Sequence, residues 1–263
     1  MNVLDLYDSF VFDLDGVLYI QNEPISSGIA FANRVSFAGK QRLFLTNNSK
    51  YTRADYRDKL SRLGVSGVKE EEILTSAYAA VFFLKKNRDI KGKSAFALGG
   101  LGLREELKSA GMTVLEGDAG RGADFVLVGW DTELTFDRLK NAVLAVNAGA
   151  EFIATNDDAT FPAPDGLWPG AGAIVAAVER ATGRTPVIVG KPHRYMMDIA
   201  LARLGGSSER TVLIGDRLET DVLGGRRAGI KTALVLTGVS KREDVERSEL
   251  QPDHVLESLE EWL

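Results

Sequence analysis

Apolar and polar residues follow one another along this chain in patterns that predict alternating strands and helices. Short apolar runs closed by a polar or glycine turn are typical of buried strands, and apolar residues three or four positions apart indicate helices. In the first part of the chain this pattern predicts strands at 10–12 and 42–45 and helices at 29–37, 56–63 and 79–83. Strands that alternate with helices in this way favour a parallel sheet.

The pattern restarts after residue 91 and returns to its first form near residue 187. The middle block has predicted strands at 94–98, 112–115, 124–129 and 152–155, helices at 135–147 and 173–182, and an ordered loop at 157–172. The last block has predicted strands at 187–189, 211–214 and 232–236, helices at 195–204 and 221–228, and a tail at 255–263 that ends in a small helix. We therefore predict an α/β protein with a parallel-sheet core (1–78 and 184–263) and an inserted α/β domain (79–183).

Composition narrows the range of functions. The chain has 263 residues, of which 44% are hydrophobic and 26% charged, as is ordinary for a globular protein. A net charge of -5 offers no basic surface for a nucleic acid polymer. The absence of cysteine excludes disulfides and thiol catalysis. No stretch approaches the roughly 20 apolar residues of a membrane span, and no secretory signal is present, so we expect a cytoplasmic protein without a membrane partner.

The first predicted strand runs into two acids, Asp13 and Asp15. On an ideal strand both side chains point to the same side. The carboxyl end of a strand in an open α/β sheet borders the crevice where ligands bind. Two carboxylates directed at one point favour a cation with oxygen ligands, and Mg²⁺ fits this preference. Taken alone, the segment slightly favours an ordinary turn in which Gly16 supplies a positive φ.

Three further predicted strands also end in polar residues that suit phosphoryl transfer: Thr46, Lys191, and Asp216 with Asp221. Each has a simpler explanation, because Thr46 could cap a helix, Lys191 could be a surface lysine, and Asp221 could favour a helix start. If all four strands belong to one parallel sheet, these residues meet at one edge. The joint pattern therefore favours a phosphoryl-transfer site.

Four motifs carry a resemblance to a known family: Asp13-Leu14-Asp15-Gly16-Val17, Thr46-Asn47-Asn48-Ser49, Gly190-Lys191-Pro192 and Gly215-Asp216-Arg217-Leu218-Glu219-Thr220-Asp221. In this order they resemble the haloacid-dehalogenase superfamily, and within it the NagD and 4-nitrophenylphosphatase group. The subgroup is indicated by Thr-Asn-Asn-Ser, by the long insert, and by Ala154-Thr155-Asn156 followed by Pro169-Gly170-Ala171-Gly172.

The resemblance implies a haloacid-dehalogenase-like Rossmannoid core and a role for each motif residue. Asp13 would be the nucleophile that becomes phosphorylated. Asp15 would be the general acid–base, with its backbone carbonyl also bound to Mg²⁺. Thr46, Asn47 and Lys191 would hold the phosphoryl group.

The resemblance also implies a metal site and a role for the insert. Asp13 and Asp216 would be ligands of Mg²⁺, and Asp221 would support the metal or its waters. The insert would be an α/β cap that closes over the core and contacts the substrate, a small phosphorylated metabolite. The likeness also favours a homodimer formed through this cap.

The expected function is Mg²⁺-dependent hydrolysis of a phosphomonoester, such as 4-nitrophenyl phosphate, phosphoglycolate, or a nucleotide or sugar phosphate. A phosphotransferase or phosphomutase with the same core is the nearest alternative, and a non-catalytic protein that binds a phosphorylated ligand is another. A dehalogenase would have no use for Asp15 and Asp216. The Asp157–Trp168 segment departs from the group, and we expect Trp168 to anchor this loop and His193 to lie at the surface.

Overall fold

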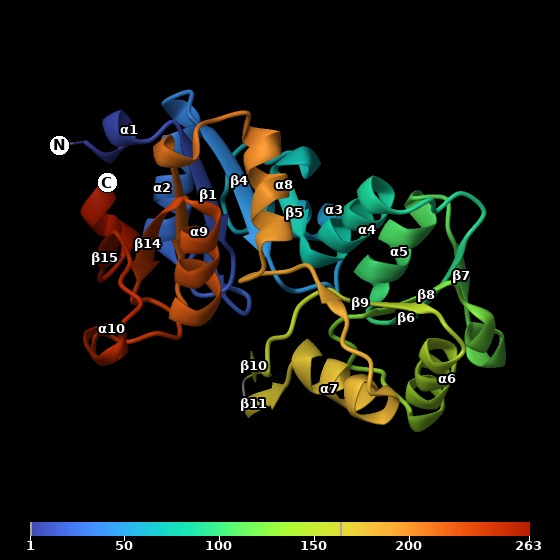
Figure 1. Cartoon of the computed structure of the whole chain (residues 1–263). Coiled ribbons are helices and arrows are strands. Elements are labelled where there is room, and N and C mark those ends of the chain that lie inside the picture. The colour runs from blue at the N-terminus through green and yellow to red at the C-terminus, as the bar shows by residue number, and fades with distance from the viewer. Residues whose placement is uncertain (1, 164) are drawn as a thin grey trace. The chain divides into compact units, whose positions relative to one another are not determined.

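The computed structural model describes residues 2–163 and 165–263 and divides into two compact units (Figure 1). The core unit consists of Met1–Thr46, Ala54–Leu74 and Lys191–Leu263. The insert unit consists of Asn47–Arg53 and Thr75–Gly190. The second unit therefore begins and ends at other residues than the predicted 79–183, and it also takes in a short segment after Thr46.

The core unit is built on a six-stranded sheet in the order β15-β14-β13-β1-β4-β5. Its strands are β1 (Ser9–Asp13), β4 (Gln41–Thr46), β5 (Ile73–Thr75), β13 (Thr211–Gly215), β14 (Lys231–Val235) and β15 (His254–Leu256). Strand β1 pairs in parallel with both β4 and β13, and β13 to β15 continue in parallel. The predicted α/β class with a parallel sheet is confirmed.

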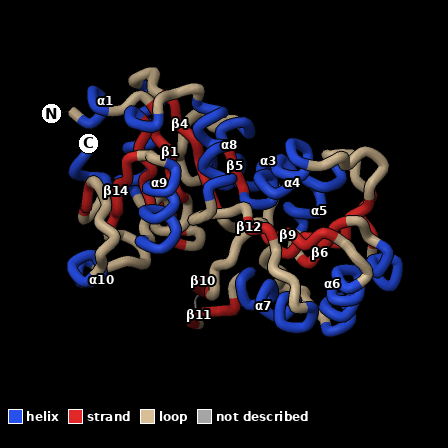
Figure 2. Tube along the Cα trace, viewed as in Figure 1, coloured by secondary structure: helices blue, strands red, loops and turns tan. Residues whose placement is uncertain are grey.

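The helices of the core unit alternate with its strands along the chain, and Figure 2 shows the helices in blue and the strands in red. They are α1 (Val3–Leu6), α2 (Ser26–Phe37), α3 (Arg53–Arg62), α8 (Arg194–Leu204), α9 (Leu223–Ala228) and α10 (Arg242–Arg247).

Both faces of the central strands are buried in packing contacts. Phe10 and Phe12 of β1 lie in ring contact with Phe31 of α2, at 5.7 and 6.1 Å between centroids. Leu213 of β13 packs close to Gly225 of α9. Strands buried on both faces explain why the sequence shows continuous apolar runs here.

The insert unit contains a parallel five-stranded sheet in the order β12-β9-β8-β6-β7. Its strands are β6 (Ser94–Leu98), β7 (Thr113–Leu115), β8 (Phe125–Val128), β9 (Glu151–Ala154) and β12 (Val187–Ile188). Its helices are α4 (Ser76–Asn87), α5 (Leu101–Ser109), α6 (Phe136–Asn147) and α7 (Ala171–Thr182).

Strand β12 corrects one prediction. The run before Lys191 was expected to belong to the core sheet, but Val187 and Ile188 pair with β9 of the insert sheet. The pairing continues beyond the strand, because the Gly190 amide donates to the Thr155 carbonyl at 2.7 Å. An apolar triplet fits the edge of either sheet, and the sequence pattern carries no information on which partner it takes.

One other segment also differs from the prediction. The expected loop at 157–172 contains a hairpin of β10 (Thr160–Ala163) and β11 (Gly166–Pro169). The tail ends in a short helix as expected, a 3₁₀ helix at Leu259–Trp262 that follows β15. Among the described residues no helix is long and apolar enough to cross a membrane.

Candidate active site

Three neighbouring strands of the core sheet end in the predicted site residues. Strand β1 ends at Asp13, β4 ends at Thr46, and β13 ends at Gly215, immediately before Asp216. Since β1 lies between β13 and β4 and all three are parallel, their carboxyl ends form one edge of the sheet. The side chains of Asp13, Thr46 and Asp216 are almost completely buried there.

Lys191 joins two of the acids. Its ammonium donates to Asp13 Oδ1 at 2.6 Å and to Asp221 Oδ1 at 2.7 Å. The second carboxylate oxygen of Asp221 accepts from the backbone N–H of Arg217 at 3.1 Å, within a turn of π-helix at Leu218–Val222. The lysine lies immediately after the end of the insert unit and is buried, so it is part of the core site and does not belong to the solvent-exposed surface.

Asp216 is held by backbone on two sides. Its Oδ2 accepts from the Val239 N–H at 2.8 Å. A Cβ added to Gly16 would lie 2.4 Å from that oxygen, and one added to Gly238 would lie 2.0 Å from it. Gly16 also has φ +80, which glycine adopts without strain. These two glycines therefore let two backbone segments approach the carboxylate closely.

The three acids meet the geometric requirement of a cation site. Asp13, Asp216 and Asp221 each offer a carboxylate oxygen, and these oxygens lie within 4.8 Å of one another. Such a set of hard oxygen donors suits Mg²⁺ or Ca²⁺. Lys191 supplies one positive charge to this group, so a divalent cation would balance the carboxylates further.

Burial controls the electrostatics of this cluster. Burial raises the pKa of Asp13 well above its usual range, against the opposing effect of Lys191. Burial, together with the neighbouring Asp221, raises the pKa of Asp216 to about 7. Burial alone would lower the pKa of Lys191, but Asp13 and Asp221 outweigh it and raise that pKa. The cluster therefore favours any added positive charge.

Asp15 lies in the turn that follows β1. The turn closes through hydrogen bonds from the Leu18 N–H to the Leu14 carbonyl and from the Gly16 N–H to the Tyr19 carbonyl, at 2.9 and 2.8 Å. Burial raises the pKa of Asp15, although Lys59 opposes the shift. A carboxyl with a raised pKa is suited to give up and recover a proton near neutral pH.

Thr46 and Asn47 follow each other in sequence but belong to different units. Thr46 is the last residue of β4, and since α3 begins only at Arg53, it does not cap that helix. Asn47 belongs to the insert unit, where its Nδ2 donates to both oxygens of Asp158 at 3.1 and 3.3 Å. The structure therefore brings Thr46 to the core edge and gives Asn47 a carboxylate partner.

Trp168 and His193 can also be placed. The Trp168 indole donates to Asp165 Oδ1 at 2.7 Å, within the β10–β11 hairpin, and its side chain is exposed. His193 is half-buried and directly precedes α8.

Sequence reasoning missed several residues that support the site. Val239 and Gly238 hold Asp216 from the loop after β14. Tyr19 pairs with Asp15 in an isolated β-bridge, and the charge of Lys59 lowers the pKa of Asp15. Gly238 within a polar loop after a strand was the only available signal, and it did not indicate which side chain the loop would contact.

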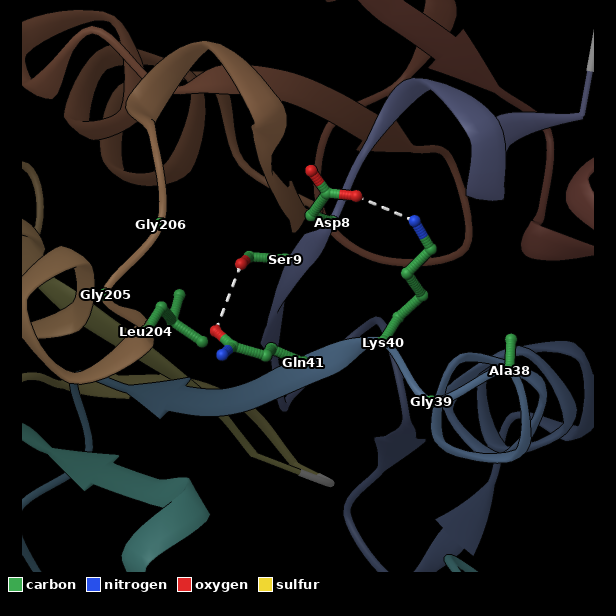
Figure 3. A pocket seen from close by; sticks show the side chains of 9 residues that line it. All are labelled: Asp8, Ser9, Ala38, Gly39, Lys40, Gln41, Leu204, Gly205 and Gly206. Atoms are coloured by element: carbon green, nitrogen blue, oxygen red, sulfur yellow. Dashed lines mark hydrogen bonds and ion pairs between the residues drawn. The ribbon is translucent and has the colours of Figure 1, made fainter.

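A separate depression of about 390 Å³ lies at the opposite, amino-terminal end of β1 and β4 (Figure 3). Here Ser9 donates to Gln41 at 3.3 Å and Lys40 donates to Asp8 at 2.8 Å. None of the predicted site residues lines this depression.

Comparison with known proteins agrees with this geometry. Residues 10–113 match the family model described as haloacid dehalogenase-like hydrolase, and residues 188–262 match one described as HAD-hydrolase-like. The chain is 38% identical to phosphoglycolate phosphatase 2 of Arabidopsis thaliana, over 96% of this chain and 91% of that protein.

Two solved structures are also similar over nearly the whole chain. The 4-nitrophenylphosphatase of Thermotoga maritima is 36% identical, with a TM-score of 0.90 over 98% of this chain and 97% of the other. The glycerol phosphate phosphatase of Mycobacterium tuberculosis, solved in complex with calcium, is 30% identical, with a TM-score of 0.89 over 98% of this chain and 75% of the other.

Proposed function

This chain belongs to the haloacid-dehalogenase-like hydrolases, in the NagD-like group of phosphoric monoester phosphatases, and from that premise we propose that it hydrolyses small phosphorylated metabolites with Mg²⁺. The proposed route passes through an aspartyl phosphate on Asp13. The main observation that supports this proposal is the group of Asp13, Asp216 and Asp221, whose carboxylate oxygens lie within 4.8 Å of one another. Lys191 donates hydrogen bonds to two of these three acids.

The first proposed step transfers the phosphoryl group to the protein. A carboxylate oxygen of Asp13 forms a bond to phosphorus while the ester P–O bond breaks. Asp15, protonated beforehand, gives its proton to the leaving oxygen, so that an alcohol departs instead of an alkoxide. Lys191 and Thr46 stabilise the phosphoryl oxygens.

The second proposed step regenerates the enzyme. Asp15, now ionised, takes a proton from a water molecule as that water attacks phosphorus. The bond between phosphorus and Asp13 breaks, inorganic phosphate leaves, and both acids return to their initial states. One carboxyl thus serves as acid in the first step and as base in the second, which requires the tunable pKa that burial provides.

The metal would be held by Asp13, Asp216 and the backbone carbonyl of Asp15, with Asp221 in support. When bound, Mg²⁺ would neutralise the carboxylate and the phosphate so that two anions can approach each other. The buried oxygen-only donor set fits this ion. A related phosphatase solved with calcium is consistent with a divalent cation in this family.

The substrate is proposed only as a class. The similar proteins are named for phosphoglycolate, 4-nitrophenyl phosphate and glycerol phosphate, which share a phosphomonoester and little else. We assign the choice among such substrates to the insert unit, acting as a cap. A homodimer through this unit is part of the proposal, and light scattering of the purified protein tests it.

The decisive experiment measures phosphate release from a panel of phosphomonoesters, with Mg²⁺ and with EDTA. We expect metal-dependent release that Asp13→Asn abolishes without unfolding the protein, and that Asp15→Asn slows by about 10² to 10⁴-fold. Release that persists in Asp13→Asn would refute the nucleophile. Transfer of phosphate to an added alcohol in preference to water would favour a phosphotransferase, and binding without turnover would favour a non-catalytic role.

A further inference from the structure

The loop after β14 is bonded to two parts of the proposed metal site. Its Val239 N–H donates to the Asp216 carboxylate at 2.8 Å, and its Ser240 N–H donates to the Asp216 carbonyl at 3.0 Å. At the start of the loop, the Thr237 hydroxyl donates to the Gly16 carbonyl at 2.6 Å. One short loop therefore connects the residue that follows β13 with the turn that follows β1.

The bond from Thr237 fixes the backbone beside Asp15. The Gly16 N–H donates to the Tyr19 carbonyl at 2.8 Å, and this N–H lies in the same planar peptide as the Asp15 carbonyl. In a trans peptide the N–H and the C=O point in opposite directions, so the Asp15 carbonyl is directed away from Tyr19. Thr237 holds the carbonyl of the next peptide. Together the two hydrogen bonds determine where the Asp15 carbonyl points.

The turn that carries this carbonyl lies directly beside Asp216. A Cβ added to Gly16 would be 2.4 Å from Asp216 Oδ2, the same oxygen that accepts from Val239. The turn and the carboxylate are therefore in close contact, and the loop after β14 is bonded to both. A movement of this loop would displace the Asp15 carbonyl and the Asp216 carboxylate relative to each other.

We propose that Thr237 is a positioning residue for the metal, and that its hydroxyl favours Mg²⁺ relative to Ca²⁺. Thr237 acts by holding the Asp15 carbonyl in a fixed position relative to the Asp216 carboxylate, and it is not itself a ligand. The inference rests on the proposed function, because both of these oxygens are ligands of the proposed Mg²⁺ site.

The two ions differ in how strictly they require ligand geometry. Mg²⁺ needs a nearly octahedral set of oxygens at about 2.0–2.1 Å, whereas Ca²⁺ accepts about six to eight oxygens at about 2.3–2.6 Å in flexible arrangements. Removing a group that orients a metal ligand typically lowers metal affinity by about 10- to 100-fold. Freeing the Asp15 carbonyl should therefore weaken the binding of Mg²⁺ more than that of Ca²⁺. A general loosening of the fold would weaken the binding of both ions equally.

The test measures the binding of each ion by isothermal titration calorimetry, on protein that EDTA and dialysis have freed of metal. Thr237→Val keeps the shape of the side chain and removes the hydroxyl. We expect this variant to raise the Kd for Mg²⁺ about tenfold, and to raise the Kd for Ca²⁺ by a several-fold smaller factor. Thr237→Ser keeps a hydroxyl and should restore most of the lost Mg²⁺ affinity.

A matched control removes a similar hydrogen bond at the opposite end of β13. The Thr211 hydroxyl donates to the Ser207 carbonyl at 2.9 Å, and the Thr211 side chain is buried. Thr211→Val should leave both Kd values unchanged.

A second variant tests the same loop from its other end. The Ser240 hydroxyl accepts from the Leu218 N–H at 3.2 Å, so Ser240→Ala also loosens the loop and should cause the same selective loss of Mg²⁺ affinity. Thermal unfolding in EDTA checks that each variant is folded, and Ser240→Ala decides the question if Thr237→Val does not fold.

The outcomes of this test are distinct. Equal losses of affinity for the two ions in a folded variant, or no loss for either, would refute the positioning role and leave the proposed hydrolysis standing. A wild-type protein that binds neither ion would instead refute the proposed metal site and, with it, the proposed function.

Discussion

Replacing Lys191 by Met should destabilise the core unit strongly when no divalent cation is present. The ammonium lies 2.6 Å from Asp13 and 2.7 Å from Asp221, and all three side chains are buried. Methionine has a similar length and no charge, so the substitution removes the cation while leaving little empty volume. Two carboxyls then remain buried without the lysine between them.

The structure allows the size of the effect to be bounded. With an effective dielectric constant of about 20, each contact contributes about 6 kcal/mol of gross Coulomb attraction, most of which the desolvation of the three ions offsets. Removing one partner of a buried ion pair typically costs about 3–5 kcal/mol. Asp13 can relieve part of this by taking a proton, since its pKa is already raised by burial. We expect a loss of about 3 kcal/mol in the free energy of unfolding near neutral pH.

The loss of stability in Lys191→Met should depend on pH. A group whose folded-state pKa is raised stabilises the fold below its unfolded pKa, and this contribution is lost as the pH rises through the folded pKa. In the variant, Asp13 has lost the ammonium that held its pKa down, so its folded pKa rises further. The deficit relative to wild type should therefore be larger at about pH 8 than at about pH 5.

Urea unfolding in EDTA, followed by circular dichroism, measures this loss as a shift of the midpoint at constant slope. Lys231→Met is the control, since Lys231 contacts Asp253 at a similar 2.7 Å but is half exposed, and its loss should cost under about 1 kcal/mol. Adding Asp221→Asn to Lys191→Met should recover part of the stability. Equal midpoint shifts for the two lysine variants would refute the view that Lys191 neutralises the buried acids.

Three other measurements test the site and the electrostatics of the insert unit. Removing divalent metal with EDTA should lower the melting temperature by about 5–10 °C relative to a hundredfold excess of Mg²⁺ over its Kd, and Asp216→Asn should abolish the difference. Gly238→Ala places a methyl group 2.0 Å from the Asp216 carboxylate and should raise the Mg²⁺ concentration needed for half-maximal activity, whereas Gly122→Ala meets no neighbouring atom and should leave it unchanged. The hydrogen bond from Lys93 lowers the pKa of Asp124 to about 2 in the folded protein. The ionised Asp124 therefore stabilises the fold above its unfolded pKa, and this stabilisation is lost as the pH falls through the folded pKa. The difference in melting temperature between wild type and Asp124→Asn should therefore narrow as the pH falls from about 5 to about 2.5, and a constant difference would contradict the assignment.

The elements that the sequence predicted well are those set by local pattern. The run Phe10–Phe12 is apolar throughout and is followed by Asp13. The strand and its carboxyl end can therefore be predicted without knowing which strands pair with it. Helix α8 and strand β13 are likewise bounded by glycines and polar turns close to the expected positions. Because the carboxyl ends of adjacent parallel strands share an edge, the meeting of Asp13 and Asp216 followed from topology.

Strand pairings and side-chain contacts between segments far apart in the sequence could not be predicted. Val187 and Ile188 are compatible with either sheet, and only the pairing with β9 decides between them. Hairpin β10–β11 contains prolines that weaken the strand signal. The contact of Lys59 with Tyr19 joins a helix to a distant turn, and a lysine on a helix surface gives no sign of where its ammonium will lie.

The positions of these unpredicted contacts have a common physical reason. The acids at the strand ends can be placed by local rules, but burying them raises their pKa values and would leave them protonated without compensation. Compensation has to come from other parts of the chain: Lys191 from directly after the insert, the Val239 amide from the loop after β14, and Lys59 from helix α3, whose charge lowers the pKa of Asp15. Lys191 supplies positive charge to Asp13 and Asp221, the Val239 amide donates to Asp216, and Lys59 supplies positive charge near Asp15. The three acids therefore experience different environments at one sheet edge, and such differences are what allow neighbouring carboxyls to act as nucleophile, acid–base and metal ligand.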